Sequence, residues 1–385
     1  MKTIYCVITA RPSYSRIRSF LLEINKDPNY DLHIILASSA IISNYGDIRK
    51  TVTLDGLKIR AEISNMLFPQ GITTMPKTTA LQLYELSILF SSQKVDAVIT
   101  IADRYETIAT SIAASYLNIP LIHIQGGEIS GNIDEKTRHA NTKLADLHLA
   151  CSELAKERII KMGENPKMVY NCGCPSIDLA KKAITSNYNI KEIIDSYNGI
   201  GKKIESYFED YIVVLQHPET DNFNSAETQI SNTLNALKDL TNQIFVFWPN
   251  SDAGTDGTAK GIRKFREAYN PENFYFFKNF KPEDFIRLIK HAKLLVGNSS
   301  VGLREASFIS TPVLNIGDRQ MNRDRGNNVT DCPHNKRLMR QKVNNLLNSD
   351  KKIESNYLYG TGDAGRMMLN ALNEFNYSFT KVNRW

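Results

Sequence analysis

Short apolar segments alternate with segments expected to be helical along nearly the whole chain, and this alternation constrains the fold more than any other feature. Strands of a parallel sheet form almost continuous apolar runs because helices cover both faces of the sheet. We therefore expect an α/β fold built on doubly wound parallel sheets. In the first half of the chain, the expected strands are residues 2–10, 31–39, 95–103, 121–127, 147–152 and 169–173.

A polar segment rich in Asn, Lys and Glu, residues 183–210, interrupts this series once. A second series follows, with strands expected at 211–216, 244–249, 274–278, 294–297 and 312–316, and helices at 225–241, 259–269, 282–290 and 301–308. A chain of 385 residues is longer than one core normally requires. We expect Rossmann-like domains over 1–182 and 211–362, a linker over 183–210, and a C-terminal helix and tail over 363–385. Two such domains favour an active site in the interdomain cleft.

The composition excludes several classes of protein. The net charge is only +6, and Lys and Arg are spread along the chain, so no nucleic-acid-binding surface is expected. The five cysteines have no metal-binding spacing, and no Gly-x-Gly-x-x-Gly motif follows the first expected strand, so we expect neither a metal nor a cofactor. No apolar run approaches the roughly 20 residues that cross a bilayer. With no leader pattern, the sequence predicts a cytoplasmic protein without membrane partners.

Acidic and basic residues gather in the segment 101–146. Asp103 and Glu128 stand at the ends of two expected strands, and Arg104, Asp134 and Arg138 lie close to them in the sequence. Ligands of open α/β sheets collect at the carboxyl ends of strands. One acid at a strand end could simply cap a helix. Three acids beside arginines indicate proton transfer to and from a substrate, with neighbours moving their pKa values apart.

Two further sites favour an anionic ligand. The run 297–302, Gly-Asn-Ser-Ser-Val-Gly, follows an apolar strand, and its small residues and the hydroxyls of Ser299 and Ser300 suit a phosphate. An ordinary helix cap is the alternative interpretation. We expect Glu305 about one turn into the following helix, where it could accept from a ribose hydroxyl. Arg11, at the end of the first strand, could bind a pyrophosphate through two parallel hydrogen bonds.

Polar residues follow three other strands of the second series. His217 lies in the run Leu-Gln-His-Pro-Glu-Thr, and its position at a strand end makes a functional role as plausible as a structural one. Asn250 and Asp252 follow the next strand, and Arg319 lies in Gly-Asp-Arg-Gln after the last one. Two other histidines, His123 and His148, fall inside apolar strands and are expected in the core.

These motifs together resemble the UDP-N-acetylglucosamine 2-epimerases, especially the hydrolysing branch that makes N-acetylmannosamine for sialic acid. The resemblance covers about residues 3–375. It rests on the motifs ADRYE (102–106), GGEISGNIDE (126–135), RHANTKLA (138–145), CGCPSID (172–178), LQHPET (215–220), PNSDAG (249–254), GNSSVGLRE (297–305), GDRQ (317–320) and RGNNV (325–329). It implies two Rossmann-like domains of the GT-B type, the second of them nucleotide-binding, and a homodimer or homotetramer.

The resemblance also implies a reaction in two stages. UDP leaves C1 with loss of the C2 proton, giving a 2-acetamidoglycal, and water then adds to give N-acetylmannosamine with inverted C2. Carboxylates near the sugar and cations near the diphosphate would stabilise this path. By motif, the residues implied for the sugar are Asp103, Glu128 and Asp134, supported by Arg104, Arg138 and His217. Those implied for UDP are Arg11, Ser15, Asn250, Asp252, Ser299, Ser300, Glu305 and Arg319.

Two positions depart from the family pattern. The family usually has an acid where this chain has Ser13, and a histidine where it has Ala40. These changes bear on the sugar, so a modified substrate such as a UDP-2,4-diacetamido-trideoxyhexose is one alternative. Others are a non-hydrolysing UDP-GlcNAc 2-epimerase, a GT-B glycosyltransferase, and a nucleotide-sugar-binding protein without activity. The sequence does not assign which carboxylate takes the C2 proton.

Overall fold

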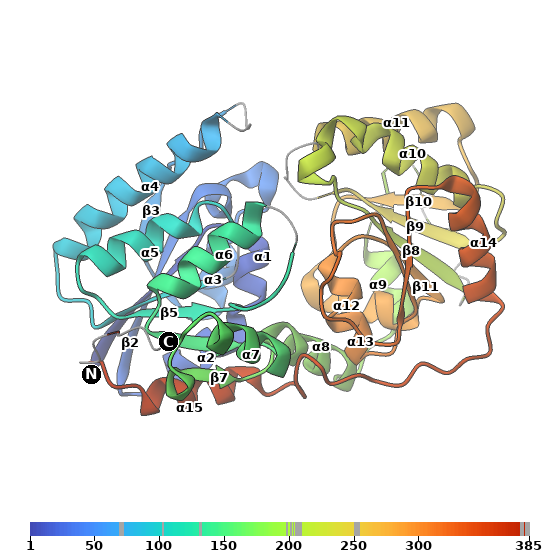
Figure 1. Cartoon of the computed structure of the whole chain (residues 1–385). Coiled ribbons are helices and arrows are strands. Elements are labelled where there is room, and N and C mark those ends of the chain that lie inside the picture. The colour runs from blue at the N-terminus through green and yellow to red at the C-terminus, as the bar shows by residue number, and fades with distance from the viewer. Residues whose placement is uncertain are drawn as a thin grey trace. The chain divides into compact units, whose positions relative to one another are not determined.

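A computed structural model describes residues 1–68, 73–101, 104–130, 133–197, 199–200, 202, 204, 210–249, 255–377 and 381. The chain forms two compact units (Figure 1). The first unit comprises Met1–Ile129, Ile133–Asp178 and Tyr359–Trp385, and the second comprises Ser130–Asn132 and Leu179–Leu358. No helix in the described ranges is both long and apolar enough to span a membrane. The domain bounds expected from the sequence stay a prediction.

In the described part of the first unit, seven parallel strands form one sheet in the order β3-β2-β1-β4-β5-β6-β7. Strands β4, β5 and β6 are buried throughout and β1 is buried from Ile4 onwards, as the mainly apolar sequence pattern predicts. The strands are β1 (Lys2–Ile8), β2 (Tyr30–Ala37), β3 (Lys58–Ile63), β4 (Ala97–Ile101), β5 (Leu121–Ile124), β6 (Leu147–Ala150) and β7 (Val169–Asn171).

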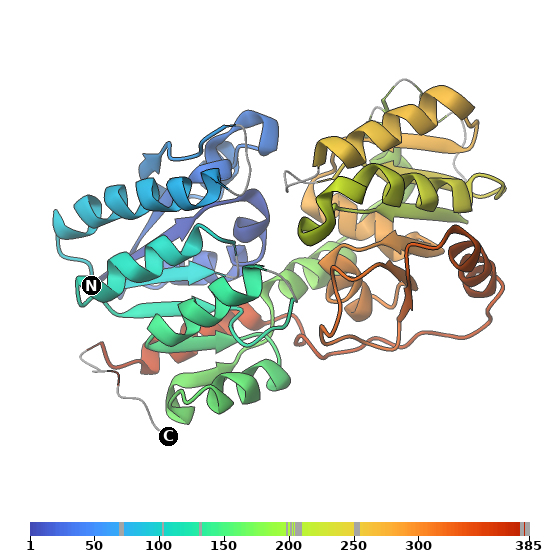
Figure 2. The same ribbon diagram turned by 45° about the horizontal axis from the view of Figure 1, so that its top comes forward.

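Helices cover both faces of this sheet (Figure 2). One face packs against α1 (Arg11–Ser15), α2 (Arg18–Lys26), α3 (Arg49–Leu54) and α15 (Ala364–Glu374). The other packs against α4 (Thr74–Ser91), α5 (Thr107–Tyr116) and the end of α6 (Ile133–Leu144). Towards β6 and β7, α7 (Glu153–Lys161) completes the core.

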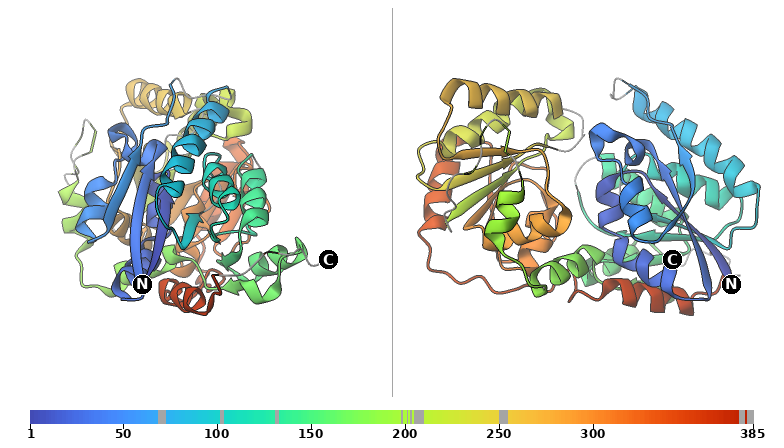
Figure 3. Two further views of the ribbon diagram at one scale, coloured as in Figure 1. Left: turned by 90° about the vertical axis from the view of Figure 1, so that its left-hand side faces the viewer. Right: turned by 180° about the vertical axis from the view of Figure 1, so that it is seen from behind.

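The end of the chain returns to the first unit, where α15 lies beside α2 (Figure 3). Gly365 permits this close packing, because a Cβ there would come within 2.8 Å of the Ser19 carbonyl carbon. The carboxylate of Asp178, in α8 (Pro175–Thr185), accepts the N–H groups of Ala364 and Gly365 at 2.8 Å each. These two donors lie in the first turn of α15, which has no intrahelical acceptors for them.

The second unit repeats the plan. Its described strands are all parallel, in the order β10-β9-β8-β11-β12-β13. They are β8 (Tyr211–Leu215), β9 (Gln243–Phe247), β10 (Phe274–Phe277), β11 (Leu294–Gly297), β12 (Val313–Ile316) and β13 (Val329–Cys332). One face packs against α10 (Ala226–Leu237), α11 (Thr255–Tyr269) and α14 (Lys336–Leu347). On the other, Phe247 of β9 contacts Phe285 of α12 (Pro282–His291), which packs on α9 (Ile190–Ser196).

The strand order reverses direction at one point in each sheet, between β1 and β4 and between β8 and β11. Loops that leave adjacent strands on either side of such a point run to opposite faces and open a crevice, where ligands of doubly wound proteins bind. The ends of these four strands are therefore where each unit is expected to bind a ligand.

The expected doubly wound parallel sheets are confirmed, and one expected helix needs correction. The helix expected at 301–308 is interrupted: a 3₁₀ turn, η5 (Ser300–Gly302), precedes the short α13 (Glu305–Phe308). The buried Arg304 between them has φ −98° and ψ −77°, which bends the backbone away from helical geometry. The helical segment after β1 is likewise divided into α1 and α2, because Ile17 between them departs from helical φ and ψ.

Candidate active site

Arg11 lies at the carboxyl end of the first sheet, where it opens α1 after β1. Its side chain packs against Gly46, because a Cβ at Gly46 would come within 2.9 Å of Arg11 Cδ. Gly46 also has φ +85°, which favours glycine independently. Burial lowers the pKa of the Arg11 guanidinium. Ser15, also in α1, donates a hydrogen bond to the Arg11 carbonyl oxygen at 3.4 Å, so its hydroxyl makes a local contact.

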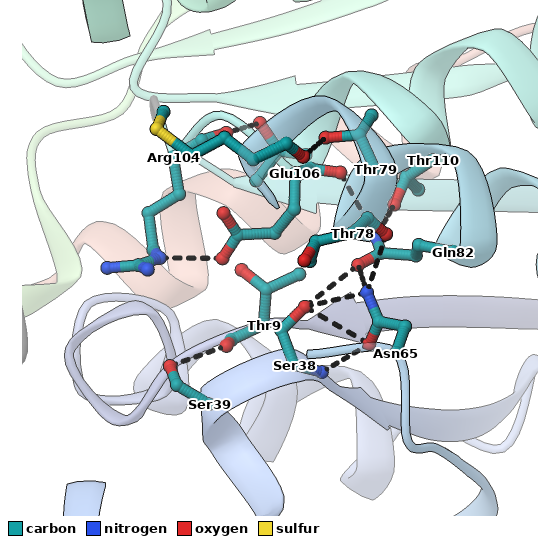
Figure 4. Close-up of polar contacts among 12 residues, drawn as sticks. Thr9, Ser38, Ser39, Asn65, Thr78, Thr79, Gln82, Arg104, Glu106 and Thr110 are labelled. Atoms are coloured by element: carbon teal, nitrogen blue, oxygen red, sulfur yellow. Dashed lines mark hydrogen bonds and ion pairs between the residues drawn. The ribbon is translucent and has the colours of Figure 1, made fainter. Parts of the chain in front are cut away.

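A buried polar network in the first unit joins the turn after β2 to α4 and α5 (Figure 4). Asn65 accepts the N–H of Ser38 at 2.8 Å and donates to Gln82 Oε1 at 3.2 Å. Gln82 Nε2 donates to the carbonyl oxygen of Glu106 at 3.1 Å. Ser38 has φ +51°, and the contacts with Asn65 hold it in this sparsely populated conformation. The network thereby fixes the turn that contains Ala40.

Arg104 follows β4 and pairs with a buried carboxylate. Its Nε donates to Glu106 Oε1 at 2.6 Å, and the side chain of Glu106 is fully buried. Glu106 Oε2 and the Thr9 hydroxyl are also buried, and neither has a hydrogen-bond partner among the described residues. Figure 4 shows the Glu106 carboxylate next to Thr9 and directed at Arg104. A charge-assisted bond of this kind holds the guanidinium in one orientation.

Glu128 and Arg138 meet beyond the end of β5. Arg138 Nη1, from α6, donates to the Glu128 carbonyl oxygen at 2.7 Å, and both residues are buried. The chain reaches Glu128 through Gly127, which has φ +73° and leaves no room for a Cβ against the carbonyl oxygen of Ala155. Burying a charged side chain without a partner costs free energy. The nearly complete burial of Glu128 and Arg138 therefore sets them apart from ordinary surface charges.

In the second unit, His217 follows β8 and Asn298 follows β11, on the two sides of the switch point. Asn298 Oδ1 accepts the N–H of His217 at 2.7 Å, and Asn298 Nδ2 donates to the His217 carbonyl oxygen at 2.9 Å. Asn298 is fully buried and His217 nearly so. The backbone of His217 is therefore held by a side chain of the adjacent strand end.

Ser299 and Ser300 are half-buried at the end of β11, where Ser299 caps η5. Glu305 is the first residue of α13, so the position predicted for it, one turn into a helix, is wrong. Its Oε2 is buried without a hydrogen-bond partner in the part of the chain that the structure describes. Because α13 has only four residues, its dipole is small.

Arg319 lies in the turn after β12 and is tied to the same strand end. Arg319 Nη1 and Gln320 Nε2 donate to the Asn298 carbonyl oxygen at 3.2 and 3.0 Å. Asn298 thus contacts the turns that follow β8 and β12, and sequence reasoning gave it no role. The sequence around Asn298, Gly-Asn-Ser-Ser, does not indicate that its side chain contacts His217, which lies 81 residues away.

Some of the predicted site residues are brought together by the structure, and others are not. The structure brings together Glu128 with Arg138, and His217 with the turn of Arg319 through Asn298. Arg104 has a separate buried partner, Glu106. Four predicted residues cannot be placed: Asp103, Asn250 and Asp252 lie outside the described residues, as does the side chain of Asp134 in α6. No cluster of three potential metal ligands occurs among the residues described. His123 and His148 are buried in β5 and β6, as predicted.

The fold and these strand-end residues define a class of protein, the GT-B-type proteins with two Rossmann-like units. The solved structure of the UDP-GlcNAc 2-epimerase from Neisseria meningitidis bound to UDP-GlcNAc matches with a TM-score of 0.81. The match covers 97% of this chain and 100% of that one, at 17% identity. At this identity the likeness shows the fold, and it confirms the GT-B type expected from the sequence.

The family is shown by sequence. The family model described as UDP-N-acetylglucosamine 2-epimerase matches residues 22–373. The polysialic acid biosynthesis protein P7 of Escherichia coli is 32% identical over 358 residues, covering 92% of this chain and 88% of that protein. The hydrolysing UDP-N,N'-diacetylbacillosamine 2-epimerase of Legionella pneumophila is 30% identical, with coverages of 94% and 92%. This chain belongs to the UDP-N-acetylglucosamine 2-epimerase family, which confirms the resemblance seen in its motifs.

Proposed function

We propose that this enzyme is a hydrolysing 2-epimerase that converts a UDP-activated N-acetyl amino sugar and water into UDP and the free C2 epimer. With UDP-GlcNAc the product is N-acetylmannosamine. The proposal rests on one observation: this member of the family has two groups of residues at strand ends, and the two groups differ in their chemistry. The first unit presents Glu128 with Arg138, and the second presents Ser299 and Ser300 beside the turn of Arg319.

The chemistry demands both sets. The C2 proton of the sugar is not acidic, so departure of UDP must lead, and positive charge develops on the ring. Cations on the leaving diphosphate and carboxylates near the ring stabilise that transition state more than the ground state. We assign Arg11, Arg319, Ser299 and Ser300 to the diphosphate, and Glu305 to the ribose.

For the sugar, we assign Glu128 as an acid or base, together with Asp103 and Asp134. Arg138 fixes the backbone of Glu128 through its bond to the carbonyl oxygen. Arg104, oriented by Glu106, and His217, held by Asn298, support the reacting groups. Ser15, Asn250 and Asp252 complete the proposed binding set.

Isotope labelling tests the proposal. In water enriched in ¹⁸O, elimination breaks the C1–O bond, so the label enters the free sugar and UDP stays unlabelled by mass spectrometry. Label in UDP would instead indicate attack at phosphorus and would exclude the glycal path. Recovery of a C2-epimerised sugar still attached to UDP would make the chain a non-hydrolysing epimerase. Release of UDP only after addition of an acceptor would make it a glycosyltransferase.

A second candidate substrate is a UDP-2,4-diacetamido-trideoxyhexose. The relative from Legionella is named for the UDP sugar N,N'-diacetylbacillosamine, which supports this alternative. Ser13 and Ala40 are small and fully buried beside the ends of β1 and β2. The ratio of kcat/KM for the two UDP-sugars decides between them, because the preferred sugar should exceed the other by at least tenfold.

We also propose that the enzyme forms a homodimer or homotetramer. Three large apolar residues on one face of α4, Leu81, Tyr84 and Ile88, are 43%, 66% and 51% exposed. Lys77 and Glu85 lie at equal distances before and after Leu81 in this helix. If α4 of one copy paired antiparallel with α4 of a second copy about Leu81, Lys77 of each copy would lie opposite Glu85 of the other. Sedimentation of the wild type and of Glu85→Lys tests this: the variant should dissociate at concentrations at which the wild type is associated.

A further inference from the structure

The carboxylate of Glu219 joins three segments of the second unit. Its Oε1 accepts the backbone N–H of Asp318 at 2.9 Å and lies 2.9 Å from Nε2 of His334. Its Oε2 accepts Nε2 of Gln229 at 3.2 Å. Since an ionised carboxylate only accepts hydrogen bonds, His334 Nε2 is the donor in this pair. The Glu219 side chain is only 13% exposed, so water competes little for these bonds.

The turn after β12 lies directly against this pair. A Cβ at Gly317 would come within 2.1 Å of Glu219 Oε1 and 2.2 Å of His334 Nε2. Gly317 also has φ +73°, so both its conformation and its surroundings favour glycine. The backbone of this turn is therefore packed on the Glu219–His334 pair.

The next side chain of the turn beyond Asp318 is Arg319, which we assign to the diphosphate. Its Nη1 donates to the carbonyl oxygen of Asn298 at 3.2 Å. The turn is thus held at two adjacent residues: Asp318 by Glu219, and Arg319 by Asn298. Loss of either contact would let the guanidinium leave its orientation, and bidentate recognition of a phosphate depends on that orientation.

We propose that Glu219 and His334 are positioning residues for Arg319, and that they set the affinity for the diphosphate of the nucleotide. This inference rests on the proposed function, which places Arg319 at the diphosphate. Glu219 and His334 act on the nucleotide only through the backbone of the turn, without touching it.

Whether substitution of Glu219 weakens or tightens UDP binding distinguishes a positioning role from a simple electrostatic effect. A carboxylate near a diphosphate repels it, so removing the charge of Glu219 would by itself tighten UDP binding. Loss of the Asp318 contact has the opposite effect. Glu219→Ala removes both the charge and the contact, whereas Glu219→Gln removes the charge but keeps an oxygen that can accept from Asp318. Positioning therefore predicts opposite outcomes for the two substitutions.

The test is calorimetric titration of the full-length protein with UDP, together with steady-state kinetics. We expect Glu219→Ala to raise the Kd for UDP at least tenfold and to raise KM similarly, with kcat within threefold of the wild type. Glu219→Gln should bind UDP as tightly as the wild type, or more tightly. His334→Ala should weaken binding about fivefold, and His334→Gln, which keeps a donor, should restore it.

His33→Ala is the matched control. His33 also pairs with a carboxylate, Asp31 at 2.8 Å, but near the amino end of β2 in the first unit, so its loss should leave UDP affinity unchanged. Unchanged or tighter binding by Glu219→Ala would overturn the inference. If that variant does not fold, equal affinities of His334→Ala and His334→Gln would overturn it. Absence of UDP binding by the wild type would instead overturn the proposed function, and this inference with it.

Discussion

The amide of Asn298 binds both backbone polar groups of His217, accepting its N–H at 2.7 Å and donating to its carbonyl oxygen at 2.9 Å. The two residues stand on either side of the point where the second sheet reverses its strand order. A side-chain amide can satisfy an adjacent N–H and C=O together, because it carries a donor and an acceptor side by side. The contact thereby sets the direction in which His217 leaves the strand.

Asn298→Ala should destabilise the fold and impair catalysis. The substitution leaves the two buried backbone groups of His217 without these partners, at about 1–3 kcal/mol for each unsatisfied group. Urea denaturation measures the loss, and kcat should fall as His217 moves. Asn235→Ala is the control, because Asn235 Nδ2 donates to the Ser231 carbonyl oxygen within its own helix, α10. Equal losses from the two variants would show that Asn298 does not hold His217 in place.

Glu128→Gln should reduce turnover by about 10²–10⁴-fold, the usual contribution of a general acid or base. The shape of the side chain is kept, and Arg138 bonds the backbone carbonyl of residue 128, so the fold and UDP affinity should be unchanged. Paired measurements of kcat and of the Kd for UDP check this, with the exposed Glu157→Gln as control. A Glu128→Gln enzyme with full activity would take Glu128 out of the mechanism.

Arg11→Ala should weaken UDP binding by about 1.5–3 kcal/mol, the contribution of a hydrogen bond to a charged group. Gly46→Ala offers an independent variant, since its Cβ would meet Arg11 Cδ, Nε and Nη1 and displace the guanidinium. Both variants should therefore show a raised Kd in calorimetric titration. Wild-type affinity in Arg11→Ala would place Arg11 outside the diphosphate site.

Acid stability should depend on Glu164, which lies away from the strand ends. Burial alone would raise the pKa of Glu164, but hydrogen bonds from His148, Lys143 and Lys381 outweigh it and lower the pKa to about 2. A folded-state pKa below the ordinary 4.5 stabilises the protein above pH 4.5, and this contribution is lost as the pH falls towards 2. The loss should approach roughly 3 kcal/mol.

The prediction is tested by measuring the free energy of unfolding with urea at pH 6 and at pH 3. The wild type should lose more stability between these values than Glu164→Gln, which carries no titrating group at that position. Glu153→Gln, at an exposed carboxylate in α7, should behave as the wild type. The same pH dependence in all three proteins would show that Glu164 does not control acid stability.

The apolar strands could be predicted from the sequence because burial on both faces leaves an unbroken apolar run. The edge strand β3 could not, since Lys58–Ile63 alternates charged and apolar residues and is buried only at its end. The break between η5 and α13 was also missed, because it depends on the tertiary burial of Arg304. A local pattern contains no information about such contacts.

Strand-end residues could be recognised individually, whereas their partners could not. Asn298 and His217 are 81 residues apart, and Glu219 and His334 are 115 apart. Neither Asn nor Glu at a strand end indicates which distant backbone or side chain it will contact. Glu106 follows Arg104 by only two residues, yet its complete burial depends on the packing of α4 and α5 around it.

The most direct measurement is a proton NMR time course of UDP-GlcNAc with the enzyme in D₂O, without added metal. We predict release of UDP together with free N-acetylmannosamine that carries deuterium at C2, because the C2 proton is lost in the elimination and replaced from solvent. N-acetylmannosamine that retains the original C2 proton would contradict the elimination step. UDP binding without turnover would contradict UDP-GlcNAc as the substrate and favour the modified sugar.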